Sequence, residues 1–141
     1  MLLKFDHINY LAVIVAGLGA FFLGALWYMP LFGKLWLSLH GFSEERIKAM
    51  QARTPPPLFF GGMIISYLVI ALAVALLVVN LDLKTPLPDG LILGLVIWFL
   101  VAAVEFTGQL SSDRHHGIYA INVGFQFVYL IGMGVLLTYW R

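Results

Sequence analysis

Four long stretches of this chain contain almost no charged side chain. Their apolar parts lie at about residues 8–29, 58–81, 90–110 and 117–140. Each stretch has about 20 residues or more, and a helix rises about 1.5 Å per residue, so each can cross a hydrocarbon core of about 30 Å. We therefore predict an all-α, polytopic membrane protein with four transmembrane helices in an antiparallel bundle.

The composition agrees with lipid as the solvent. Of the 141 residues, 62% are hydrophobic and 11% are charged, whereas a soluble domain has about 25% charged residues. The net charge of +1 gives no basic footprint for nucleic acid. The absence of cysteine excludes disulfides and thiol chemistry. We expect one membrane domain, residues 1–141, that binds no cofactor.

One sizeable loop, residues 30–57, separates the first two spans. Pro30 is expected to end the first transmembrane helix, because proline lacks the backbone N–H that a helix interior requires. Ser43 can cap a short helix at the membrane surface, with Glu44 and Glu45 in its favourable first turn. The prolines at 55–57 should end that helix. We expect one interfacial helix in this loop.

Lysine and arginine residues are unevenly divided between the two sides of the predicted bundle. One side carries five and the other carries three. The five are Lys34, Arg46, Lys48, Arg53 and Arg114, and the three are Lys4, Lys84 and Arg141. Because cytoplasmic loops are enriched in these residues, we predict that both termini are non-cytoplasmic.

Small residues recur on the predicted transmembrane helices. They are Ala12, Ala16, Ala20 and Gly24 in the first span, Gly90 and Gly94 in the third, and Gly124 and Gly132 in the fourth. Small side chains allow helix backbones to approach closely in lipid. We expect these residues to pack helices within one subunit, and a contact between subunits is the alternative.

Four polar side chains are expected to form a strip between the third and fourth spans. Glu105 and Gln109 share one helix face, and Asn122 and Gln126 share another, because each pair is spaced by four residues. A hairpin centred near residue 113 places position 105 level with position 122. An ionisable group inside a span suggests a proton site, a cation site or a polar ligand contact. A structural hydrogen bond between helices is the alternative.

His115 and His116 are weak candidates for metal ligands. They are adjacent, so on a helix their side chains point about 100° apart and chelate one ion poorly. No motif with metal-ligand spacing accompanies them. The sequence therefore predicts neither a metal site nor catalytic residues.

Aromatic and basic residues at the predicted span ends suggest anchors in the headgroup layer. These residues are Trp27, Tyr28, Lys34, Trp36 and Trp140. Aromatic rings favour the headgroup layer, and a lysine can extend its ammonium group towards it. A docking site for a lipid or a protein partner is the alternative for the segment from Trp27 to Trp36.

The segment from Gly24 to Lys34, together with Asn9–Tyr10, Trp36 and Ile121–Asn122, resembles a known family. This is the domain-of-unknown-function 1761 family of small bacterial membrane proteins, and the resemblance extends over nearly the whole chain. It implies a four-helix membrane protein without an assigned activity. We accordingly expect the bacterial cytoplasmic (inner) membrane as its location.

Three classes of function are compatible with these features. We favour a non-enzymatic membrane protein, acting as a homo-oligomer or as a small accessory subunit of a larger membrane complex, with the bilayer and itself or other membrane subunits as partners. A small channel or transporter using the polar strip is the first alternative. The second is a membrane enzyme acting on a lipophilic substrate, for which the chain offers only Glu105, Arg114, His115 and His116.

Overall fold

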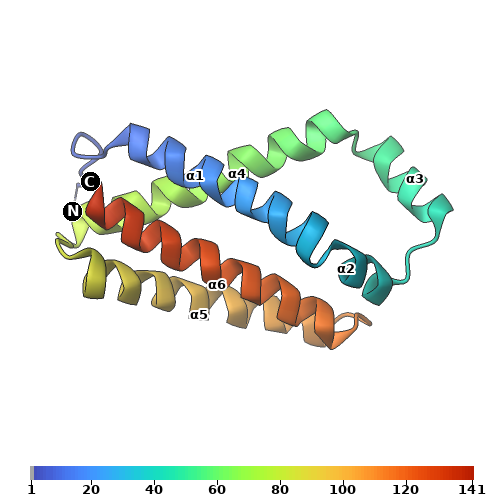
Figure 1. Ribbon diagram of the computed structural model, residues 1–141. Helices are drawn as coiled ribbons and strands as arrows, with labels where there is room; N and C mark the ends of the chain where they lie inside the picture. The colour runs from blue at the N-terminus through green and yellow to red at the C-terminus, as the bar shows by residue number, and fades with distance from the viewer. Residues whose placement is uncertain (1) are drawn as a thin grey trace.

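Helices make up all of the regular structure in the computed structural model, which describes residues 2–141 (Figure 1). In chain order they are α1 (Tyr10–Leu26), the π-helical turn η1 (Trp27–Leu31), α2 (Gly33–His40), α3 (Glu44–Arg53), α4 (Pro56–Asn80), the short π-helical segment η2 (Pro86–Gly90), α5 (Leu91–Leu110) and α6 (His116–Tyr139). Four helical segments are long and apolar enough to cross a membrane: Tyr10–Leu31, Pro56–Asn80, Pro86–Leu110 and His116–Tyr139. The predicted all-α fold with four spans is confirmed.

The helices begin where local chemistry satisfies their free N–H groups. The Asn9 side chain accepts a hydrogen bond from the Ala12 N–H at 3.1 Å, which caps α1. Prolines occupy the start of α4, where a missing N–H has no consequence. At the start of α6, His115 Nδ1 accepts from the Gly117 N–H at 2.9 Å.

The prediction that Pro30 ends the first helix is wrong. The chain continues through Pro30 as η1, in which the Phe32 N–H donates to the Trp27 carbonyl at 2.8 Å. The wider turn accommodates the proline ring without requiring its absent N–H. A second helix, α2, follows directly, so the loop contains two helices rather than the one expected. Gly33 permits this connection, because a Cβ at this position would lie 2.6 Å from the Tyr28 carbonyl oxygen.

α6 is the central helix, with α5 packed along it and with α1 and α4 on its other sides (Figure 1). α1 and α4 cross each other, and Gly17 lies at the crossing, where a Cβ would be 3.1 Å from Leu68 Cα. Just before α5, η2 approaches α6 glycine against glycine: a Cβ on Gly90 would collide with the Gly134 carbonyl. Within α5, a Cβ on Gly94 would lie 2.8 Å from the Leu130 carbonyl oxygen of α6. Small residues therefore bring three pairs of helices together inside one chain: α1 with α4, α1 with α6, and α5 with α6.

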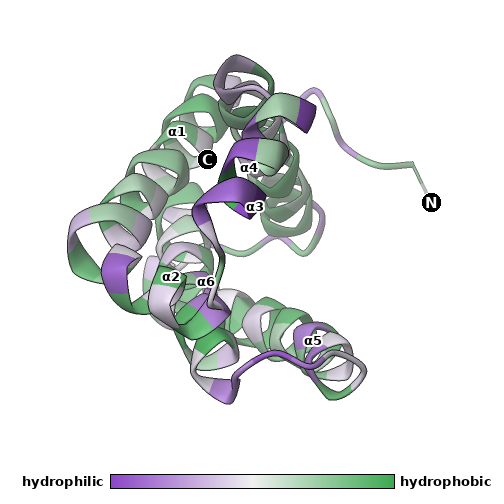
Figure 2. Cartoon of the chain, turned by 90° about the vertical axis from the view of Figure 1, so that its right-hand side faces the viewer, coloured by the Kyte–Doolittle hydropathy of each residue, from purple (hydrophilic) through white to green (hydrophobic). Residues whose placement is uncertain are grey.

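The predicted small face of α1 lies in the interior of the bundle. Ala12, Ala16, Ala20 and Gly24 are all buried, and a Cβ on Gly24 would lie 3.2 Å from the Phe125 ring of α6. Gly90 at the end of η2 and Gly94 on α5 are buried against α6. Gly124 faces the Trp27 ring, whereas Gly132 faces open space. Hydrophilic residues gather instead on α3 and in the loops (Figure 2).

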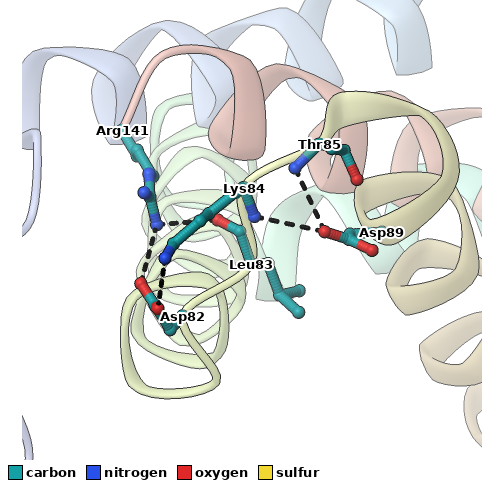
Figure 3. Close-up of polar contacts among 6 residues, drawn as sticks. All are labelled: Asp82, Leu83, Lys84, Thr85, Asp89 and Arg141. Carbon is teal, nitrogen blue, oxygen red and sulfur yellow. Dashed lines mark hydrogen bonds and ion pairs between the residues drawn. The ribbon is translucent and has the colours of Figure 1, made fainter.

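Both termini lie at one end of the bundle with the α4–η2 connection (Figure 1). Polar contacts join these segments (Figure 3): Arg141 Nη1 donates to the Leu83 carbonyl at 2.7 Å, and Asp82 pairs with Lys84 at 2.9 Å. Asp89 accepts from the Lys84 and Thr85 N–H groups. The opposite end of the bundle carries α2, α3 and the α5–α6 loop.

Candidate functional site

Glu105 on α5 receives two hydrogen bonds from α6. Asn122 Nδ2 donates to Glu105 Oε1 at 2.8 Å, and Gln126 Nε2 donates to Oε2 at 2.6 Å. Asn122 and Gln126 are one helical turn apart, so both amides reach one carboxylate. All three side chains are half-buried. Both oxygens of a carboxylate inside a predicted span are thus engaged by neutral amides.

Tyr28 connects this carboxylate to the first span. Its hydroxyl in η1 donates to Asn122 Oδ1 at 2.7 Å. Asn122 therefore uses both ends of its amide, accepting from Tyr28 and donating to Glu105. We call Tyr28, Glu105, Asn122 and Gln126 the polar tetrad. It joins three of the four transmembrane segments.

Gln109, the fourth member of the predicted strip, has hydrogen-bond partners other than the tetrad. Its Nε2 donates to the Arg114 carbonyl at 2.7 Å and lies 3.5 Å from His116 Nδ1. One turn beyond Glu105, Gln109 is level with the α5–α6 connection, whose backbone carbonyl is the nearer acceptor. Gln109 is only 2% exposed. It fixes the turn between the two helices.

The aromatic residues at the end of the first span face α6 with their polar atoms. Trp27 Nε1 donates to the Ile121 carbonyl at 3.1 Å, as Tyr28 does to Asn122. The Trp36 ring packs 4.0 Å from the His40 ring within α2. These contacts use the hydrogen-bonding groups of Trp27 and Tyr28 inside the bundle. Anchoring in the headgroup layer by Trp27, Tyr28, Lys34, Trp36 and Trp140 stays a prediction.

An aromatic cluster packs beside the polar tetrad. The Phe125 ring contacts three tyrosine rings, with centroid distances of 5.3 Å to Tyr28, 6.1 Å to Tyr67 and 4.9 Å to Tyr129. Its members come from η1, α4 and α6. Trp98, which the sequence analysis did not single out, donates from α5 to the Val123 carbonyl at 2.9 Å. Tyr28 belongs to both groups, so the aromatic cluster adjoins the tetrad.

Glu105 has no cationic partner within the part of the chain that the structure describes. The ion pairs among residues 2–141 involve Asp6 and Asp82 only. All eight Lys and Arg residues lie outside the four spans. Gln126 Oε1 is buried, and within the same residues it has no hydrogen-bond partner. The tetrad can therefore donate to a carboxylate, but it supplies no positive charge to balance one.

The two adjacent histidines have separate roles. His115 caps α6, and His116 lies beside Gln109. Among residues 2–141, no group of three His, Asp or Glu side chains is arranged to hold a metal ion.

A family model described as a protein of unknown function, DUF1761, matches residues 11–138 of the chain. The match includes nearly all of the four spans and the whole polar tetrad. No curated protein and no solved structure matches the chain.

Proposed function

Because the chain belongs to the DUF1761 family, whose description names no activity, we propose a function from the geometry of the polar tetrad. The protein is a multi-pass membrane protein. We propose that it is a small, non-enzymatic accessory subunit of a larger complex in the bacterial cytoplasmic membrane. Glu105 is the group that recognises its membrane partner.

The uncompensated carboxylate of Glu105 is the observation that carries this proposal. An ionised carboxylate in a low-dielectric environment is unfavourable by several kcal/mol unless an opposite charge accompanies it. The amides of Asn122 and Gln126 stabilise the carboxylate but do not neutralise it. The balancing charge must therefore come from outside the described chain. A basic side chain in a neighbouring transmembrane helix provides such a charge.

The position of the basic residues favours a different protein over a second copy as that neighbour. Every Lys and Arg lies outside the four spans, so a second copy of this chain presents no cation at the depth of Glu105. The small-residue face of α1 is also occupied within the chain. Both observations favour an accessory subunit over the homo-oligomer that the sequence left open.

A proton- or cation-coupled transporter is the second candidate, and the same carboxylate favours it. A proton or metal cation also compensates Glu105, and hydrogen bonds already link Tyr28, Asn122 and Glu105 in a row. The two candidates differ in what replaces the missing charge. A transporter functions as the isolated chain, whereas an accessory subunit requires its partner.

The substitution Glu105→Gln tests the accessory-subunit proposal, because it removes the charge and keeps the shape. We expect the wild-type protein, extracted gently from its native membrane, to have a native mass above that of the monomer. Cross-linking should identify a partner with a Lys or Arg inside a span. Glu105→Gln should release that partner, and replacing the partner's basic residue with leucine should do the same. Glu45→Gln on exposed α3 makes the same charge change and should leave the complex intact.

Two results would contradict this assignment. One is a wild-type protein that is monomeric in native membranes. The other is a complex that survives Glu105→Gln unchanged. Cation- or proton-coupled flux in liposomes containing only this chain, abolished by Glu105→Gln, would establish the transporter instead.

A further inference from the structure

A hollow of about 240 Å³ lies between α2, α3 and the start of α6, at the end of the bundle opposite the termini. Its lining residues are Leu39, His40, Phe42, Arg46, Asp113, Arg114, His115 and Ile118. We call it the α2–α6 hollow. It is separate from the polar tetrad, and none of the four tetrad residues lines it.

The hollow exists because α2 docks directly on the first turn of α6. The Leu39 side chain of α2 packs against Gly117 of α6, where a Cβ would lie 2.8 Å from Leu39 Cδ1. Phe42 in the α2–α3 connection and Arg46 on α3 lie over the same place, and the α5–α6 loop closes the other side with Arg114. Segments that are far apart in the sequence thus converge on one small volume.

Two arginines from different elements line the hollow without a carboxylate partner. Among residues 2–141, neither Arg46 nor Arg114 forms an ion pair. The Arg46 guanidinium lies over the Phe42 ring, 4.7 Å from its centre, in a cation–π contact. Arg114 Nε donates to Ser112 Oγ at 3.1 Å, which leaves the terminal nitrogens of this guanidinium free for another acceptor.

The surroundings of His40 reflect the positive charge of the hollow. Burial lowers the pKa of His40, and the nearby charges of Arg114 and Arg46 lower it further. The N-terminal end of α6, a helix of 24 residues, also faces the hollow and contributes its partial positive charge. Asp113 is the one acidic side chain in the lining.

We propose that the α2–α6 hollow binds a phosphate group, carried by a phospholipid headgroup or supplied as free phosphate. Guanidinium groups match phosphate oxygens in geometry and charge. The hollow lies where two spans, Pro86–Leu110 and His116–Tyr139, leave the membrane, which is the level of lipid phosphates. Asp113 repels a doubly charged anion more than a singly charged phosphodiester, so the lining favours the lipid.

Binding to the purified protein in phosphate-free detergent tests this site. One titration uses dihexanoyl phosphatidylglycerol and a second uses sodium phosphate, both at constant ionic strength. Arg46→Gln and Arg114→Gln should each weaken binding about tenfold or more, because each removes a charged hydrogen-bond donor. Arg53→Gln, also on α3 but outside the hollow, makes the same charge change and should alter affinity by less than about twofold.

The outcomes separate the two sources of phosphate. Tight binding of the lipid with weak binding of free phosphate identifies a headgroup site, and equal affinities identify a site for the anion itself. Absence of binding in both titrations would overturn the proposal, as would an equal loss in Arg53→Gln. If Arg114→Gln fails to fold, Arg46→Gln decides the result, because Arg46 is on an exposed surface helix.

Discussion

Asn122 has the central position in the polar tetrad, because its single amide serves two partners. The sequence places it level with Glu105 through the hairpin geometry, and the structure brings the two side chains to 2.8 Å. Tyr28 was not predictable as a partner from its spacing, because it lies on a helix distant in sequence. Gln109 matched the spacing but binds the Arg114 carbonyl instead. Spacing thus predicts which side chains share a face, whereas the turn geometry decides which acceptor is nearest.

Asn122→Leu should destabilise the protein, because it leaves the Tyr28 hydroxyl and one oxygen of Glu105 without partners. We expect a loss of about 1–3 kcal/mol in the free energy of unfolding, since unpaired polar groups cost about this much. Tyr119→Phe removes one hydrogen bond to the Ala102 carbonyl and should cost about 0.6 kcal/mol, the average for such bonds in membranes. Unfolding in detergent measures both, and equal losses would mean that the tetrad is no more than one ordinary contact.

His40 should make stability depend on pH below neutrality. Burial, then Arg114 and then Arg46, lower its pKa from the usual 6.5, so the unfolded chain binds a proton more readily than the folded one. The contribution of neutral His40 to the free energy of unfolding is therefore complete above pH 6.5. It is lost as the pH falls below this value. Asp113 and His115 are the other titratable groups besides the two arginines that line the hollow with His40. In phosphate-free buffer, Tm should fall less steeply for His40→Gln than for wild type between about pH 7 and pH 5, and parallel slopes would refute this.

At the scale of elements, glycine position matters more than glycine spacing. In α6 the spacing of small residues pointed to Gly132, which faces open space, and not to Gly134, which meets Gly90 of η2 directly. The two residues are two positions apart, so they lie on nearly opposite faces of one helix. The sequence shows that α6 contains small residues, but only the angular position of α5 decides which of them is needed. The π turn at Pro30 is a similar case, because the composition of that segment does not reveal whether a helix ends or widens.

Gly134→Ala should therefore weaken the α5–α6 contact. The added methyl group would collide with the Gly90 carbonyl and force the backbones apart, at an expected loss of about 1–3 kcal/mol. Gly132→Ala adds the same group to the same helix in open space, and it should be neutral or slightly stabilising. Melting temperatures of the two variants in one detergent give the comparison. If Gly134→Ala and Gly132→Ala have the same melting temperature, the close approach of the two backbones at Gly134 is contradicted.

For the whole molecule, hydropathy was sufficient to predict four spans, because the bilayer fixes both the length and the polarity of each crossing. It was not sufficient to show that α2 docks on α6, since that contact joins segments far apart in the sequence, such as Leu39 and Gly117. The loops nevertheless lie at the two ends of the bundle in the way that the count of Lys and Arg residues assumed. α2, α3 and the α5–α6 loop share one end, and both termini share the other (Figure 1).

The unequal charge of these two ends predicts how the protein is oriented. The end with α2 and α3 carries five Lys and Arg residues, and the end with the termini carries three. The two ends differ further in pairing: Asp82 pairs with Lys84 and Arg141 at the terminal end, whereas Arg46 and Arg114 form no ion pair within residues 2–141 at the other end. Unpaired cations resist translocation and attract the anionic cytoplasmic leaflet, so the end with α2 and α3 should be cytoplasmic.

Alkaline phosphatase fused after Arg141 should then be active, and the same enzyme fused after Gly41 should be inactive. Reversed activities would place the α2–α6 hollow outside the cytoplasm.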